Sequence, residues 1–107
     1  MQITREQDAL TVFLTGELDH HTAKAMRQAA DDALRSQKPD VLRLDFSGVT
    51  FMDSSGVGLI MGRYKLASSL GAALTVRGLT KRDERIVKMS GLAKLVRFED
   101  RKQEEQP

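Results

Sequence analysis

The runs 41-VLRLDF-46 and 72-AALTVR-77 enclose a segment that begins 51-FMDSSGVG-58, and together they decide the fold. Each run is rich in branched aliphatic residues, so each predicts a β-strand. Residues 56–70 predict a helix between them, and residues 47–53 a connection. This crossover is long enough for the two strands to pair in parallel, and such crossovers are nearly always right-handed. The centre of the chain therefore predicts a strand–helix–strand unit of an α/β fold.

Upstream of this unit, the chain predicts a hairpin followed by a helix. Residues 9–15 (ALTVFLT) predict a strand, and residues 2–5 predict a shorter one that pairs with it through a turn at 6–8. Residues 16–21 predict a loop. The next helix is expected over 22–36, because apolar residues recur there at helical spacing. Its opposite, solvated face is expected to carry Lys24, Arg27, Asp31 and Arg35.

Downstream, Thr80 followed by Asp83 is typical of a helix start. This third helix is expected to bury Ile86, Val87 and Met89 and to stop at Gly91. Residues 95–98 predict a last strand. The complete order predicts a single α/β domain over 1–99, with a mixed, mostly parallel sheet and helices packed against it. Residues 100–107 are almost entirely charged or amide-bearing and predict a disordered polar tail.

Composition excludes several classes of function. The 107 residues include no cysteine, so disulfides and thiolate metal sites are excluded. The 17 basic and 15 acidic side chains give a net charge of only +2, and aromatic content is 5%, which argues against nucleic-acid binding. The longest apolar stretch, 57–61, is far too short to span a membrane. The first seven residues are polar and lack the apolar core of a secretory signal, so we expect a cytoplasmic protein.

The segment 53–56 carries the chemistry that the sequence offers. Asp and Ser are favoured helix N-caps, and glycines at 56, 58 and 62 would let the helix approach the sheet closely. A helix N-terminus also favours an anion, so a phosphate on Ser54 would meet free N–H groups and the positive end of the helix dipole. It would also be repelled by Asp53. The residues alone leave both roles open, a helix cap and a phosphorylation site.

Enzymatic and metal-binding interpretations fit the residues poorly. A dinucleotide-binding turn would need glycine where Met61 stands, and no Gly-Lys-Ser/Thr triplet marks a phosphate-binding loop. A serine hydrolase would need a positioned histidine base, and the only histidines are His20 and His21. Adjacent histidines also make poor metal ligands, and we expect them to flank a helix start capped by Asp19 or Thr22.

Four stretches together resemble one known family: 14-LTGELDHHTA-23, 51-FMDSSG-56, 62-GRYK-65 and 89-MSGL-92. They are similar to the sporulation-type anti-sigma factor antagonists, which are STAS-domain proteins. The resemblance spans nearly the whole chain. The sequence departs from the family pattern at Val57, where leucine is frequent, and in its short, charged C-terminus.

The resemblance implies a switch rather than an enzyme. The unphosphorylated protein would bind an anti-sigma factor that is a serine kinase, release the sigma factor, and then be inactivated by phosphorylation on Ser54. ATP and Mg²⁺ would belong to the kinase, and a serine phosphatase would reset the protein. Partner binding would involve a set of residues around the acceptor: Asp19, Asp53, Ser55, Gly56 and Val57. The alternatives are a general-stress antagonist and a STAS scaffold that is never phosphorylated. We expect a monomer when the protein is free.

Overall fold

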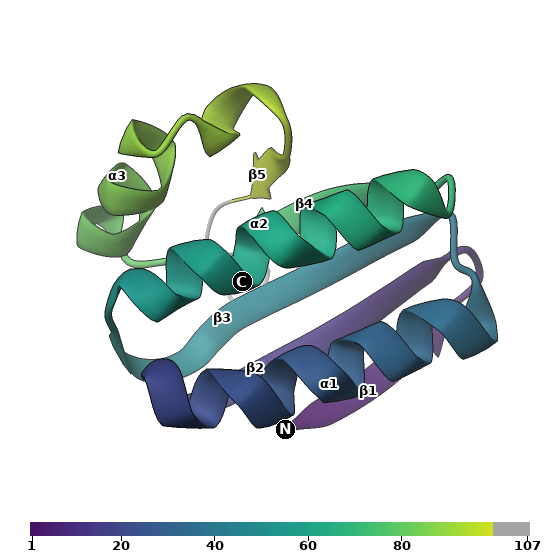
Figure 1. Ribbon diagram of the computed structural model, residues 1–107, viewed down its shortest axis with the longest axis horizontal. Helices are drawn as coiled ribbons and strands as arrows, with labels where there is room; N and C mark the ends of the chain where they lie inside the picture. The colour runs from purple at the N-terminus through teal and green to yellow at the C-terminus, as the bar shows by residue number, and fades with distance from the viewer. Residues whose placement is uncertain (100–107) are drawn as a thin grey trace, which may run out of the picture.

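The structure, a computed structural model, describes residues 1–99 as one five-stranded sheet with its helices (Figure 1). The elements in chain order are β1 (Gln2–Glu6), β2 (Ala9–Leu18), α1 (His20–Gln37), β3 (Val41–Met52), α2 (Ser54–Ser69), β4 (Ala73–Arg77), α3 (Lys81–Met89), the short 3₁₀ helix η1 (Leu92–Lys94) and β5 (Arg97–Glu99). The sheet order follows the chain order. β1 pairs antiparallel with β2, and every other pair is parallel. The predicted α/β domain with a mixed, mostly parallel sheet is confirmed.

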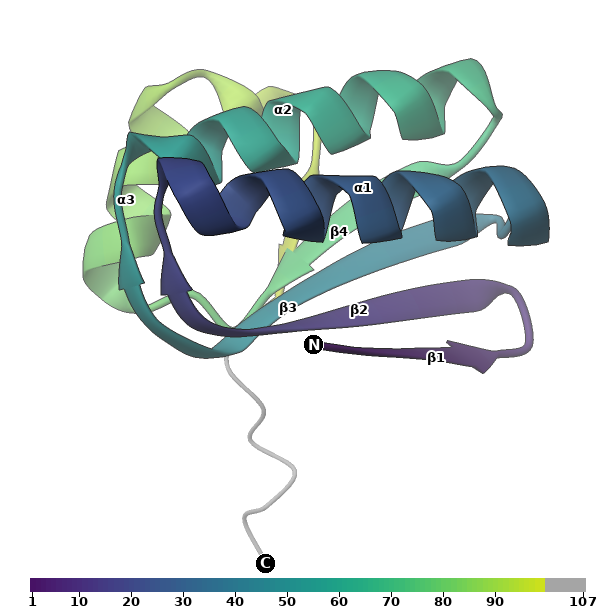
Figure 2. The same cartoon turned by 60° about the horizontal axis from the view of Figure 1, so that its bottom comes forward.

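The helices α1 and α2 lie side by side over one face of the sheet, as both views show (Figures 1 and 2). The core fills the space between these layers. Alternate residues of the strands point into it, which is why apolar and polar positions alternate along β3. The largest of the fully buried side chains are Phe46, Leu10, Leu14, Leu18, Leu34, Leu42, Leu44, Met52, Ile60, Leu92, Val12 and Val76.

Two strands extend further than the sequence predicts. β2 runs on to Leu18 and β3 to Met52, so residues 16–18 are strand rather than loop and residues 47–52 are strand rather than connection. The extensions pair with each other, from Gly16 with Val49 to Leu18 with Met52, with one register shift between Gly16 and Glu17. Gly16, Glu17, Ser47 and Gly48 have weak strand propensity, although the residues 49–51 that follow favour a strand. Parallel pairing satisfies the backbone N–H and C=O groups of both extensions.

The helices α1 and α2 also begin earlier than expected. α1 starts at His20 rather than at residue 22, and α2 starts at Ser54 rather than at residue 56. Each begins two residues after its strand ends, so that a single residue separates strand from helix. The acceptor serine predicted from the sequence is therefore the first residue of α2.

α3 buries less apolar surface than predicted. Val87 is fully buried, but Ile86 is 37% exposed and Met89 is 79% exposed, so the prediction was wrong for these two residues. The cause is position: α3 lies at the end of the molecule where α1 and α2 begin, not over a face of the sheet (Figures 1 and 2). It therefore presents only one narrow side to the core. Its predicted start is confirmed, since the Thr80 hydroxyl accepts a hydrogen bond of 3.0 Å from the Asp83 N–H.

The C-terminal end of the described chain differs slightly from the prediction. The last strand covers Arg97–Glu99 rather than 95–98. The N–H groups of Leu95 and Val96 bond back to the Leu92 carbonyl at 2.9 and 3.1 Å, which keeps these two residues with the turn of η1. The predicted polar tail, residues 100–107, lies outside the described residues. Within residues 1–99 no helix is both long and apolar enough to cross a membrane.

Candidate functional site: two adjacent helix N-termini

The first turns of α1 and α2 share one edge of the sheet. Leu18 and Met52 are directly paired at the carboxyl ends of β2 and β3, and each is followed by an aspartate that caps a helix. The backbone N–H of Asp53 donates a hydrogen bond of 3.3 Å to the carbonyl of Leu18, which ties the two turns together. Because parallel strands end at the same edge, the fold brings together Asp19 and Asp53, which lie far apart in the sequence.

Asp19 forms a complete capping box at the start of α1. Its Oδ1 accepts hydrogen bonds of 2.9 Å from the N–H groups of both His21 and Thr22. The Thr22 hydroxyl in turn accepts a hydrogen bond of 3.0 Å from the Asp19 N–H. Hydrogen bonding from Thr22 holds the pKa of Asp19 below its ordinary value, against the opposing effect of desolvation. The carboxylate at this edge is therefore ionised at neutral pH.

Asp53 caps α2 in a simpler way and leaves the side chain of Ser54, the predicted acceptor, without a hydrogen bond within the described chain. Its Oδ1 accepts a hydrogen bond of 2.8 Å from the Ser55 N–H, and Asp53 itself is exposed. Ser54 is also exposed, and its hydroxyl makes no hydrogen bond to any other residue of the described chain. Ser55 is half-buried. Of the two serines, Ser54 is thus the one that an approaching group can reach most easily.

Gly56 lies where the helix meets the sheet. A Cβ added at this buried position would lie 2.4 Å from both Cγ and Sδ of Met52, far inside van der Waals contact. At Gly58 and Gly62 an added Cβ would meet nothing within 4 Å. The predicted close approach of helix to sheet is therefore right for Gly56 and wrong for the other two glycines. Val57, the next residue, is half-buried against the core.

A groove with one basic wall, on α1, opens between the first turns of α1 and α2, and the sequence did not predict it. Its volume is about 250 Å³, and it is lined by His20, Ala23, Lys24, Arg27, Ser55, Gly58 and Leu59. The residues of its two walls are separated by about thirty positions in the chain, so no local sequence motif predicts the groove. The single available signal was the spacing of Lys24 and Arg27 on one helix face, next to a predicted helix start.

A buried ion pair joins the two helices further along. Arg63, 5% exposed, places its Nε 2.7 Å from Asp31 Oδ1, and its Nη1 donates to the Leu59 carbonyl at 3.2 Å. Burial lowers the pKa of the Arg63 guanidinium, and Asp31 opposes that effect. The prediction that Asp31 belongs to the solvated face of α1 is wrong, because α2 packs over it. The exposed residues Lys24, Arg27 and Arg35 do face solvent.

Arg43 and Asp45, which alternate with the core residues of β3, support a second polar cluster on the other face of the sheet. Asp45 Oδ2 accepts a hydrogen bond of 2.8 Å from Arg77 Nε, and its Oδ1 accepts one of 2.8 Å from the Ser47 N–H. Burial raises the pKa of Asp45, but these hydrogen bonds and the charge of Arg77 outweigh it, and the pKa lies below its ordinary value. This cluster connects neighbouring strands and lies apart from the helix N-termini.

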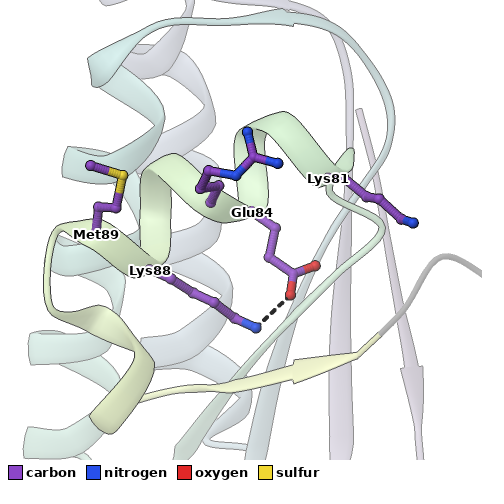
Figure 3. Close-up of a pocket in the computed structure, with 5 residues that line it drawn as sticks. Lys81, Glu84, Lys88 and Met89 are labelled. Atoms are coloured by element: carbon purple, nitrogen blue, oxygen red, sulfur yellow. Dashed lines mark ion pairs between the residues drawn. The ribbon is translucent and has the colours of Figure 1, made fainter.

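The exposed side of α3 forms a shallow surface pocket (Figure 3). Lys88 pairs there with Glu84 at 2.6 Å, and its Nζ also lies 5.2 Å from the centre of the Phe98 ring. The nearby basic residues Lys81, Arg82 and Arg85 are all exposed, in agreement with a solvated helix face. Within the described part of the chain, no three His, Asp or Glu side chains gather where they could hold a metal ion.

Comparisons with known proteins agree with this architecture. The family model described as "Mlab, STAS domain" matches residues 1–97. The anti-sigma F factor antagonist of Paenibacillus polymyxa is 36% identical over 94% of this chain and 86% of its own length. The anti-sigma-B factor antagonist of Listeria monocytogenes is 29% identical over 90% of this chain and 83% of its own. The structure of the Bacillus cell fate determinant SpoIIAA in the phosphorylated form superposes with a TM-score of 0.75 at 27% identity, covering 97% of this chain and 93% of that one. The chain therefore belongs to the STAS-domain family of anti-sigma factor antagonists.

Proposed function

We propose that this protein binds an anti-sigma factor that is a serine kinase, thereby releases a sigma factor, and is inactivated when that kinase phosphorylates Ser54. The observation that carries this proposal is the state of Ser54: exposed, free of hydrogen bonds within the described chain, and first in α2. A relative's structure is described as a phosphorylated form, which supports a phosphorylated state in this family. The protein is then a substrate rather than an enzyme, and ATP and Mg²⁺ are supplied by the kinase.

The position of Ser54 suits a switch that changes binding without unfolding the domain. A phosphoserine carries about −1.5 to −2 charges at neutral pH. The positive end of the α2 dipole stabilises that charge, while the carboxylate of Asp53 repels it. The two effects offset each other within the domain. A partner that covers Ser54 would have to desolvate the phosphate, and so the complex dissociates.

The partner-binding surface in this proposal surrounds the acceptor. Asp19 and Asp53 flank it as helix caps, and Val57 lies one helical turn further on. Ser55 and Gly56 contribute differently, since the Ser55 amide is engaged by Asp53 and Gly56 is buried against Met52. A serine phosphatase resets the protein, which acts in the cytoplasm and is a monomer when free.

The test is intact-mass spectrometry with peptide mapping after incubation with the candidate kinase and Mg-ATP. We expect one added phosphate, on Ser54, in the wild-type protein and in Ser55→Ala, and none in Ser54→Ala. Ser54→Ala should retain kinase binding, while Ser54→Asp should keep the fold and lose binding. No added mass with an active kinase would instead indicate a STAS scaffold, and labelling abolished by Ser55→Ala alone would refute the choice of serine.

A general-stress antagonist is the second candidate, because a sigma-B-type relative matches over 90% of this chain. The two candidates differ only in the partner. Titrating the unphosphorylated protein with an anti-sigma F kinase and with an anti-sigma-B kinase distinguishes them. We expect tighter binding to the anti-sigma F kinase, since the anti-sigma F factor antagonist is the more similar relative at 36% identity.

A further inference from the structure

The basic groove between α1 and α2 has a chemistry that the switch itself does not use. Lys24 and Arg27 stand three residues apart on the exposed side of α1, and both line the groove with His20. Across from them, Ser55 and Gly58 belong to the first turns of α2. The groove therefore offers cations on one wall and a hydroxyl on the other, directly beside the acceptor Ser54.

The cations of this groove have no counter-ion within residues 1–99. Neither Lys24 nor Arg27 takes part in any ion pair there. The nearby carboxylate of Asp31 is already held by Arg63 at 2.7 Å. Positive charge is also concentrated along this side of α1: burial chiefly lowers the pKa of the Arg63 guanidinium, and the charges of Arg27 and Arg35 lower it further. A negatively charged group placed in the groove would relieve this crowding.

The small volume of the groove favours side chains of a protein over an enclosed small-molecule ligand. Its volume of about 250 Å³ lies below the ~300–1,000 Å³ of pockets that enclose small molecules. It is also continuous with the proposed docking surface, since Ser55 belongs to both. Complementary charge at such a surface sets partner choice and the rate of association.

We propose that this groove receives an acidic segment of the anti-sigma factor kinase, whose carboxylates pair with Lys24 and Arg27. This inference rests on the proposed function and names the chemistry of its partner. Docking of the acidic segment places the kinase over the start of α2 and thereby orients Ser54 toward the transferred phosphoryl group. After transfer, the new phosphate repels the same carboxylates, which adds a reason for the product to dissociate.

The experiment compares two charge reversals on one helix, Arg27→Glu and Arg35→Glu. Both arginines are exposed residues of α1 and both act on Arg63, but only Arg27 lines the groove. They lie eight positions apart, about 12 Å along the helix axis. Kinase affinity is measured by calorimetry at two salt concentrations, and circular dichroism checks that each variant is folded.

We expect Arg27→Glu to weaken kinase binding by about tenfold or more and to reduce its salt dependence. Arg35→Glu should bind within about twofold of the wild-type protein, and Arg27→Lys should recover most of the affinity. A wild-type protein that does not bind the kinase at all would refute the proposed function itself. Normal wild-type binding with equal effects of Arg27→Glu and Arg35→Glu would overturn only the groove proposal.

A second measurement separates a protein partner from a free anion. Inorganic phosphate and Mg-ATP are titrated in turn into the isotope-labelled protein at constant ionic strength. We expect no saturable shift of the backbone resonances of Lys24, Arg27 and Ser55. Saturable binding of either probe in the groove, abolished by Arg27→Glu, would identify a small-anion site and overturn the proposal of an acidic protein segment.

Discussion

Replacing Gly56 with alanine separates two explanations for the glycine of the Asp-Ser-Ser-Gly segment. One explanation is contact with the partner, and the other is packing within the domain. The structure favours packing, because the added Cβ would lie 2.4 Å from both Cγ and Sδ of the buried Met52. Met52 is 2% exposed at the end of β3 and cannot swing into solvent without leaving the core. The substitution therefore overpacks the contact between helix and sheet.

The magnitude follows from two opposing terms. Forcing a methyl group into a well-packed core costs about 1–3 kcal/mol. Alanine regains up to about 1 kcal/mol over glycine in a helix, and less at its first turn. Gly56→Ala should therefore lower the free energy of unfolding by about 1–2 kcal/mol. Gly62→Ala is the matched control, since nothing lies within 4 Å of its added Cβ, and it should raise that free energy by about 0.5–1 kcal/mol.

Urea unfolding followed by circular dichroism measures both changes in a two-state domain of this size. Folded Gly56→Ala should still be phosphorylated on Ser54, because the substitution acts beneath the surface. Shortening the neighbour in the double variant Met52→Val/Gly56→Ala should give a loss smaller than the sum of the two single losses. A Gly56→Ala protein as stable as Gly62→Ala, or one that is stable but no longer binds the kinase, would refute the packing explanation.

Two further predictions concern buried charges. Asp31→Ala leaves the Arg63 guanidinium buried without its counter-ion and should lower the free energy of unfolding by about 3 kcal/mol. This is the lower end of the usual range, because the Asp31 side chain is 18% exposed. In urea titrations, the double variant Asp31→Leu/Arg63→Met should recover most of this loss. The pKa of Asp45 is lower in the folded than in the unfolded state, so this carboxylate stabilises the fold. Its full contribution to the free energy of unfolding is present above the unfolded-state pKa of about 3.9 and is lost as pH falls through the lower, folded-state pKa. The difference in unfolding free energy between the wild-type protein and Asp45→Asn should therefore shrink as pH falls from 5 to 3, and a constant difference would contradict this assignment.

Local patterns predicted most of the elements but not where they begin and end. The helical spacing of apolar residues over 22–36 and the strand-forming runs 41–46 and 72–77 were strong signals. The first two lie inside α1 and β3, and the third exceeds β4 by one residue at its start. The extensions of β2 and β3 were missed because their stability comes from pairing with each other. Residues of low strand propensity, such as Gly16 and Ser47, become strand when a neighbouring strand satisfies their backbone groups.

The sequence by itself determined the α/β class, the strand–helix–strand centre, a helix cap at Asp19 or at Thr22 three residues on, and Ser54 as the candidate acceptor. These features depend on residues close together in the chain. Tertiary structure alone decided that Asp19 and Asp53 cap adjacent helices, that Asp31 is covered by Arg63, and that Lys24 and Arg27 face Ser55 across a groove. Such juxtapositions arise from the parallel pairing of β2 with β3, which brings residues about thirty positions apart to one edge of the sheet. Local spacing contains no information about that pairing until both strands are placed in register.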